Sequence, residues 1–482
     1  MNRKKELARN TAILTVGRLC TQFISFFLLP LYTAVLATHE YGTYDVMITY
    51  AALLLPLVNW QFDQGLFRFM LDERGDREKL SELFTTLLLS SVMQCCLYAV
   101  VFFLVRPFLR MDYKEFLLVY VILHVFTALL LQFVRGLGNS VQYAVASFIS
   151  ASATTVLNVI MLVVLKMGLP GLFISTVLAQ ILTLVYLVAA SGCIGYFSPD
   201  RVRFPLLKTV GAYSLPLIPN NLAWWVVNAS DRMVINVFLG AAANGIYSVA
   251  NKFPGVFIRF YNILNLSWTE TVSLHYQDED RDEFFSETMT SLFKLFACGC
   301  FCIVAMMPFA FPVLVNIRYE AAYNQIPILM YAMIFRVLVG LYSCIYVAEK
   351  NAKKIAFTSI AAAVINLTVD LLFIRKIHVY AASVSTLVAF LTMFIFRYFD
   401  VNKTVTMKIR RPVVLWSLCF GVLNLGSYYC GRKIVQLIVL AATLVYSVVM
   451  NLDMAASGVR LIKSRFGSLH SSRKGGEDDE QN

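Results

Sequence analysis

The chain alternates long apolar stretches with short polar connections along nearly its whole length. An α-helix needs about 20 apolar residues to cross a hydrocarbon core, and this pattern predicts fourteen such helices. The first six are expected at 11–36, 42–69, 81–105, 114–134, 141–165 and 170–190. The next six are expected at 211–238, 245–272, 288–315, 326–348, 355–374 and 379–399, and a last pair at 412–429 and 434–452. The pattern therefore predicts an all-α polytopic membrane protein.

Composition strengthens this prediction and limits the function. Of the 482 residues, 59% are hydrophobic and 15% charged, whereas soluble domains carry about 25% charged residues. The fourteen spans leave only short connections, so no soluble catalytic domain fits and we expect no enzyme activity and no catalytic residues. The chain has no G-x-x-x-x-G-K-[ST] phosphate loop, and its five histidines are too scattered for a metal motif. We expect neither a cofactor nor a bound metal.

The formal charge of +12 would suit a nucleic-acid partner, but the distribution of basic residues argues against one. With the N-terminus inside, 24 of the 41 Lys and Arg residues lie in cytoplasmic segments, 9 in outer loops and 8 within spans. Short cationic segments resist translocation across the membrane. We therefore expect both termini in the cytoplasm, an even number of spans and no nucleic-acid partner.

The two blocks of six spans resemble each other, which predicts an internal repeat. LATHEYGTYDV at Leu36–Val46 aligns with LGAAANGIYSV at Leu239–Val249, at an offset of 203 residues. TVLN ending at Asn158 aligns with AVIN ending at Asn366, and ISTVLA from Ile174 aligns with VSTLVA from Val384. Because six spans is an even number, the copies have the same orientation and form a direct repeat. The predicted parts are a six-helix lobe at 1–195, a second at 196–400, an extra helix pair at 401–455 and a cytoplasmic polar tail at 456–482.

Basic residues inside the spans need an explanation, since a charge at the bilayer centre costs at least about 2.5–3.5 kcal/mol. Arg397 lies within two turns of a cytoplasmic helix end, where we expect its side chain to extend to water. Four deeper residues are candidate substrate-binding residues: Arg18, Lys252, Arg259 and Arg336. They could form a cationic track for an anionic headgroup such as a diphosphate. The alternative is structural pairing with carboxylates in the membrane.

The deep acidic residues are candidates either for ion coupling or for such pairing. Asp63, Asp231 and Asp370 are the carboxylates that could titrate in a proton- or sodium-coupled cycle. Arg232 follows Asp231 directly, and adjacent residues do not face each other on a helix, so each needs its own partner. Trp224 and Trp225 lie midway along their span, where they could stack on sugars or pack against neighbouring helices.

Several of these segments together resemble a known family. YGTYDV at Tyr41, WQFDQGLFRFM at Trp60, YSLPLIPNNLAWWVVNASDRMVI at Tyr213 and NGIYSVANKF at Asn244 resemble the Wzx-type polysaccharide biosynthesis flippases of the multidrug, oligosaccharidyl-lipid and polysaccharide (MOP) exporter superfamily. The resemblance covers most of residues 5–450. It implies a two-lobed helix bundle that moves undecaprenyl-diphosphate-linked sugars between leaflets. It also implies that Arg18, Asp63, Asp231, Arg232 and Lys252 lie on cavity-lining helices.

We therefore expect a bacterial plasma-membrane flippase that moves undecaprenyl-diphosphate-linked oligosaccharide repeat units from the inner to the outer leaflet, by alternating access through a cationic cavity. Its expected partners are this glycolipid, membrane lipids and a proton or sodium ion as coupling ion. The alternative is an ion-coupled multidrug exporter of the same superfamily, which would need a net acidic cavity. The spans hold more deep basic than acidic residues, which favours the anionic lipid.

Overall fold

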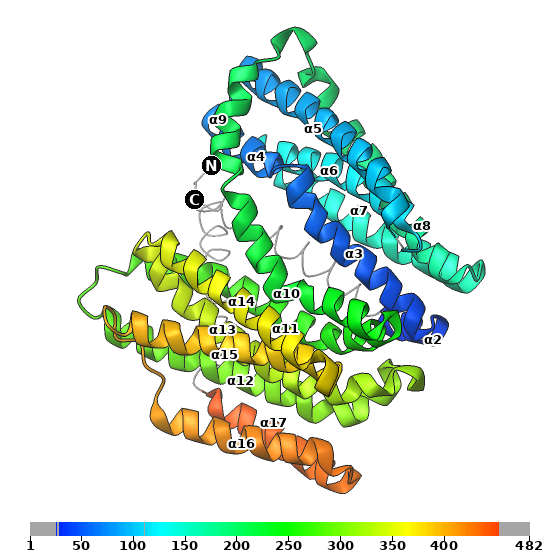
Figure 1. Cartoon of the computed structure of the whole chain (residues 1–482). Helices are drawn as coiled ribbons and strands as arrows, with labels where there is room; N and C mark the ends of the chain where they lie inside the picture. The colour runs from blue at the N-terminus through cyan, green and yellow to red at the C-terminus, as the bar shows by residue number, and fades with distance from the viewer. Residues whose placement is uncertain (1–25, 27, 110, 453–482) are drawn as a thin grey trace, which may run out of the picture. The chain divides into compact units, whose positions relative to one another are not determined.

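A computed structural model describes residues 26, 28–109 and 111–452 of the protein. The described residues form helices and connecting loops and contain no strand, which confirms the predicted all-α class (Figure 1). The first half contains α2 (Leu29–Val35), α3 (Thr38–Val58), α4 (Phe62–Asp72), α5 (Arg77–Val105), α6 (Lys114–Gly136), α7 (Ser140–Val159) and α8 (Gly168–Ser191). The remainder contains α9 (Phe204–Ser214), α10 (Leu217–Leu239), α11 (Ala241–Leu274), α12 (Arg281–Leu314), α13 (Ile326–Ala348), α14 (Ala352–Ile377), α15 (Tyr380–Val401), α16 (Arg411–Cys430) and α17 (Lys433–Met450).

Eleven helical segments of the described chain are long and apolar enough to cross a membrane. They contain α3, α5, α6, α7, α8 and α12 to α17. α10 and α11 are not among them, although they have 23 and 34 residues. These two helices carry Asp231, Arg232, Lys252 and Arg259. The protein is thus a multi-pass membrane protein, and the number of fourteen spans stays a prediction because most of the first expected span lies outside the described residues.

Two predicted spans are broken, so their expected boundaries were wrong. The span expected at 42–69 is divided into α3 and α4, because Trp60 and Gln61 have left-handed backbone conformations with φ of 51° and 57°. The span expected at 211–238 begins as the separate helix α9, and α10 follows after Pro216, which has no backbone N–H to donate to the preceding turn. In both cases apolar residues on either side of the break suggested a single span.

The described chain divides into two compact units. The first contains the described residues of Met1–Arg259, with Pro312–Leu329 and Lys353–Met393. The second contains Phe260–Phe311, Met330–Ala352 and the described residues of Phe394–Asn482. The predicted division into lobes at 1–195 and 196–400, the helix pair at 401–455 and the tail stays a prediction.

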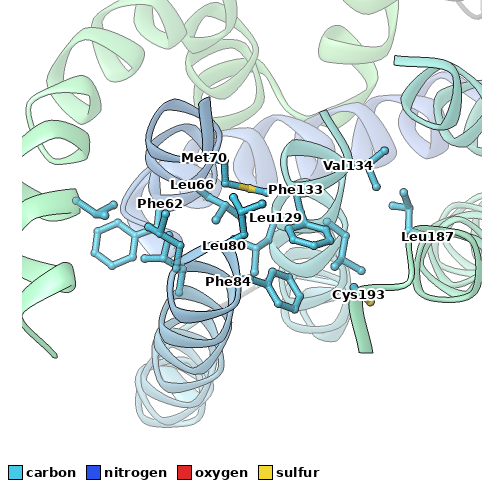
Figure 2. Close-up of a cluster of buried hydrophobic side chains, with 14 of the residues drawn as sticks. Phe62, Leu66, Met70, Leu80, Phe84, Leu129, Phe133, Val134, Leu187 and Cys193 are labelled. Atoms are coloured by element: carbon cyan, nitrogen blue, oxygen red, sulfur yellow. The ribbon is translucent and has the colours of Figure 1, made fainter. Parts of the chain in front are cut away.

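A buried apolar cluster holds the first unit together around α4 (Figure 2). Leu66 and Met70 of α4 pack with Phe84 of α5 and Phe133 of α6, and the last two rings lie 4.3 Å apart. Met70 also fills the space over Gly136, where an added Cβ would lie 2.7 Å from its sulfur. Each of these side chains is at most 1% exposed. The break after α3 therefore leaves α4 anchored against two bilayer-spanning helices.

The helices α3 and α11 cross at two glycines that the repeat alignment pairs, Gly42 and Gly245. A Cβ on Gly42 would lie 1.8 Å from the carbonyl oxygen of Ala241, and a Cβ on Gly245 would lie 2.0 Å from that of Thr38. Thr38 and Ala241 are themselves 203 residues apart. The contact is thus reciprocal between equivalent positions, as a pseudo-two-fold relation between the two halves requires.

A second recurring feature is a connecting segment that lies against a long helix. In the first unit Ser81 of α5 donates to the carbonyl of Tyr196, 2.6 Å away, and Arg203 pairs with Glu82 at 3.1 Å. In the second unit Ser286 of α12 donates to the carbonyl of Thr406, 3.1 Å away, and Arg410 pairs with Glu287 at 2.9 Å. Ser81 and Ser286 are 205 residues apart, as are Glu82 and Glu287, and each pair makes equivalent contacts in the two copies. These contacts support the internal repeat.

Candidate functional site

A buried polar cluster in the first unit surrounds Asp231 of α10. Oδ2 of Asp231 accepts a hydrogen bond from the Tyr247 hydroxyl of α11 at 2.8 Å. The Thr386 hydroxyl of α15 also lies 2.8 Å from this oxygen. Asp231 is 3% exposed and about 12 Å from the Leu239 end of its helix. The carboxylate thus lies well inside the expected membrane-spanning part of the chain.

Asp370 of α14 belongs to the same cluster. It is fully buried, and it interacts electrostatically with Asp231. Asn366 lies one helical turn before Asp370 and therefore on the same face of α14, and its amide donates to Ser385 at 3.3 Å. Four oxygens here are buried without a hydrogen-bond partner among the described residues: Oδ1 and Oδ2 of Asp370, Oδ1 of Asp231 and Oδ1 of Asn366. Such oxygens could hold a proton or a small cation.

Comparison of the two repeat copies shows which residues of this cluster occur in only one of them. In the first half Tyr44, the equivalent of Tyr247, bonds directly to Thr176 at 2.9 Å, and Asn158 bonds to Ser175. The offsets of 203 and 208 place the buried leucines Leu28 and Leu162 where the second half has Asp231 and Asp370. The tyrosine, threonine, asparagine and serine thus form a scaffold common to both halves. The two carboxylates are present only in the second.

Arg232 follows Asp231 in the chain but pairs with a different acid. Its Nε lies 3.2 Å from Oδ2 of Asp45 on α3, and the two side chains are 26% and 13% exposed. Asn244 of α11 lies 3.5 Å from the same carboxylate oxygen and donates to the carbonyl of Gly42 at 2.9 Å. The sequence interpretation did not include Asp45. The repeat alignment could have identified it, because Asp45 is a carboxylate at a position where the second copy has Ser248.

The other predicted site residues lie in several places. Lys252 is half-buried on α11, with its ammonium group 5.8 Å from the centre of the Tyr41 ring. No carboxylate lies within ion-pair distance of Lys252 in the described part of the chain. Arg259 is half-buried two turns further along the same helix. Arg336 lies in the second unit on α13, close to Tyr261, and Arg18 lies outside the described residues.

Asp63 is separate from the Asp231 cluster. It lies in the first turn of α4 and accepts hydrogen bonds from Asn59 at 2.9 Å and from Gln64 at 2.8 Å. Both carboxylate oxygens are therefore satisfied by neighbouring amides, as a structural role at the break between α3 and α4 requires.

Arg397 differs from the prediction, which placed its head group in water. Its side chain is fully buried in the second unit and bonds to the Val339 carbonyl at 3.0 Å and to the Ser343 hydroxyl. The sequence indicated only the distance of Arg397 from the end of its helix and did not show which helix packs against it. The neighbouring helix α13 covers the side chain and supplies the hydrogen-bond acceptors that water would otherwise provide.

Comparisons with known proteins agree with this architecture. The family model described as "Polysaccharide biosynthesis protein" matches residues 7–268, more than half of the chain. A structure of the lipid II flippase MurJ in an inward closed conformation matches with a TM-score of 0.72 and 11% identity, over 92% of this chain and 100% of MurJ. An inward-facing multidrug resistance MATE transporter of the MOP superfamily matches with a TM-score of 0.61 and 13% identity, over 81% of this chain and 98% of the transporter.

A search of curated proteins finds no matching sequence. At such low identities the structural matches establish the fold, which is that of the MOP-superfamily transporters. The family match rests on the sequence itself and covers the first half, α10 and most of α11. This chain is a member of the polysaccharide biosynthesis protein family, as the resemblance of its sequence motifs predicted.

Proposed function

We propose that the protein moves undecaprenyl-diphosphate-linked oligosaccharide repeat units from the inner to the outer leaflet of the bacterial plasma membrane, with both termini in the cytoplasm. No covalent chemistry is needed for this step. The barrier is the desolvation of a diphosphate and several sugars in hydrocarbon. A wet interior with fixed positive charges lowers that barrier, because it replaces the lost water with favourable electrostatic interactions.

The observation that carries this proposal is the pair of basic side chains on α11. Lys252 and Arg259 lie on one helix two turns apart, and Lys252 has no acidic partner within ion-pair distance among the described residues. A lysine can neutralise a phosphate as a point charge, and an arginine can bind one bidentately. Arg18 and Arg336 remain further candidate substrate-binding residues in this proposal. The family membership and the fold shared with a lipid II flippase favour a polyprenyl-linked glycan as the anionic cargo.

We further infer that Asp231 and Asp370 hold the coupling ion, a proton or Na⁺. A buried carboxylate without hydrogen-bond donors is unfavourable unless it binds one or the other. Na⁺ prefers oxygen ligands, as other hard cations do, and the unpartnered oxygens of Asp231, Asp370 and Asn366 are of this kind. Binding there removes the repulsion between the two carboxylates and so changes the relative stability of the conformations that alternating access requires. Arg232 has a structural role, since it pairs with Asp45.

The test is transbilayer movement of a fluorescent undecaprenyl-diphosphate oligosaccharide in liposomes that contain the protein, measured by accessibility to an external quencher. We expect protein-dependent movement that falls at least tenfold in Lys252→Ala and in Arg259→Ala. Lys433→Ala is the control, because this lysine lies at the start of α17 and bonds to the Pro308 carbonyl. Unchanged movement in both variants would refute the cationic cavity.

The second candidate is an ion-coupled multidrug exporter, which the fold shared with a MATE transporter and the buried carboxylate pair favour. It predicts uptake of a lipophilic cation into the same liposomes when a proton or sodium gradient is imposed. Such uptake without glycolipid movement would replace the flippase proposal with this one.

A further inference from the structure

A row of polar and aromatic side chains runs along α10. Asn220, Trp224, Asn228 and Arg232 follow one another at intervals of four residues and therefore lie on one ridge of the helix. Asn220 and Asn228 are exposed, and Trp224 and Arg232 are half-buried. The ridge thus leads from uncharged amides and an indole ring to the half-buried cationic side chain of Arg232.

The exposed amide of Asn228 indicates that this ridge faces water. It lies eleven residues from each end of α10, a distance of about 16 Å along the axis. Its side chain is too short to reach an interface from there, and an amide in contact with lipid tails lacks hydrogen-bond partners. The Nδ2 of Asn228 donates to the Trp224 carbonyl at 2.6 Å, which leaves its oxygen and its second N–H available. An exposed amide at this depth is therefore expected to line an aqueous cavity.

The break between α3 and α4 places Gln61 beside the start of this ridge. Gln61 has a positive φ, as does the preceding Trp60, and each such residue costs about 1–3 kcal/mol, so the surroundings must hold it in place. The Asn59 side chain does so by accepting from the Gln61 backbone N–H at 2.8 Å. The Asn221 amide of α10 donates to Oε1 of Gln61 at 2.8 Å. The strained backbone thus positions a third amide, that of Gln61, next to Asn221 and beside the ridge.

We propose that Gln61, Asn220, Trp224 and Asn228 form the subsite that binds the sugars of the transported lipid. Amides both donate and accept, so they can pair with neighbouring hydroxyl groups of a sugar, and an indole face can pack on a pyranose ring. The four side chains carry no charge, which suits uncharged sugars and leaves the diphosphate to the basic residues. Trp225 has another role, because its indole donates to the Thr49 carbonyl at 3.1 Å and joins α10 to α3. This inference rests on the proposed flippase function.

A first experiment tests whether the ridge faces water. Asn228→Cys is compared with Val364→Cys, which lies near the middle of α14 and is 59% exposed. Both variants are made in a background in which the exposed cysteines Cys96, Cys419 and Cys430 are serines. We expect a charged, water-soluble maleimide to label the cysteine at position 228 at least tenfold faster than that at position 364. Equal slow labelling at both positions would mean that the ridge faces lipid and would overturn the proposal.

A second experiment tests recognition of the sugars. Binding of undecaprenyl-diphosphate oligosaccharides extracted from the native cells is compared with binding of undecaprenyl diphosphate without sugars. We expect Trp224→Ala and Asn228→Leu to weaken binding of the glycolipid at least tenfold and to leave the sugar-free lipid unchanged. The control is Trp416→Ala, since Trp416 is 59% exposed on α16 and is not part of the ridge.

Equal weakening of both lipids would indicate a structural defect and contradict the subsite, as would no weakening of either. The flippase proposal fails in a different way, because the wild-type protein would then move neither lipid across the bilayer. If the wild-type protein moves the glycolipid and the variants bind it normally, the flippase proposal stands and the subsite proposal is rejected.

Discussion

Asp370 differs from other buried acids of the described chain because both of its carboxylate oxygens lack a hydrogen-bond donor. Asp63 is nearly as deeply buried, but two amides satisfy it. The structure thus separates two residues that have the same chemistry in the sequence. Only the environment of Asp370 leaves its carboxylate dependent on a proton or a cation.

The first prediction at the residue scale concerns ion coupling. Asp370→Asn has nearly the same shape but cannot bind a coupling cation as a carboxylate does, so we expect glycolipid movement to lose its dependence on an imposed Na⁺ or proton gradient. The measurement is the rate of movement in liposomes with and without each gradient. Asp63→Asn serves as the control and should keep the dependence of the wild type. A gradient effect that persists in Asp370→Asn would remove this residue from the coupling site.

The second prediction concerns the ion pair between Arg232 and Asp45. Removal of one partner from a largely buried pair leaves the other unpaired, and we expect Asp45→Asn and Arg232→Gln each to destabilise the protein by about 2 kcal/mol. The double variant should be more stable than the sum of the two losses predicts. Thermal unfolding in detergent provides the measurement. The exposed pair of Arg68 and Asp72 is the comparison, and Arg68→Gln should leave the unfolding temperature nearly unchanged.

At the scale of helices, the crossing of α3 and α11 depends on two residues without side chains. Gly42 and Gly245 let α3 and α11 meet at backbone distance, and both were visible in the sequence as a matched pair of the repeat. The alignment did not show that they contact each other. That contact follows from the symmetry of the fold, which brings equivalent positions together near the axis.

We predict that Gly42→Ala destabilises the protein by about 1–3 kcal/mol, because its Cβ would lie 1.8 Å from a backbone oxygen that cannot rotate away. Gly255→Ala on α11 is the matched control, since no atom lies within 4 Å of its added Cβ. The control should be neutral or slightly stabilising, as alanine favours helix over glycine. Equal unfolding temperatures for the two variants would contradict the close crossing.

At the scale of the whole molecule, the orientation in the membrane follows from charge and can be tested directly. We expect an impermeant thiol reagent to label Phe108→Cys and Arg432→Cys in intact cells, because both lie in exposed connections that the sequence predicts outside. Asp200→Cys and Lys403→Cys should react only after permeabilisation. The reverse pattern would invert the topology and, with it, the proposed direction of transport.

The sequence by itself determined the helical class, the approximate extent of most spans, the internal repeat and the family. These features depend on the local run of apolar residues and on matches along the chain, and each is present before folding. The sequence also identified Asp231, Arg232 and Asp370 as residues that need partners. A charge inside a membrane-spanning helix is costly whatever its surroundings, so the need for a partner can be read without knowing which residue provides it.

Tertiary structure alone decided which partner each residue has. Arg232 pairs with Asp45 of the opposite half, Tyr247 and Thr386 meet at Asp231, and Arg397 is covered by α13. It also decided that α3 ends at Val58 and α4 begins at Phe62, although apolar residues on both sides of the break suggested one span. Hydrogen bonds and ion pairs form only within a few ångströms. Helix packing sets those distances between residues that are far apart in the chain, and the local sequence does not specify them.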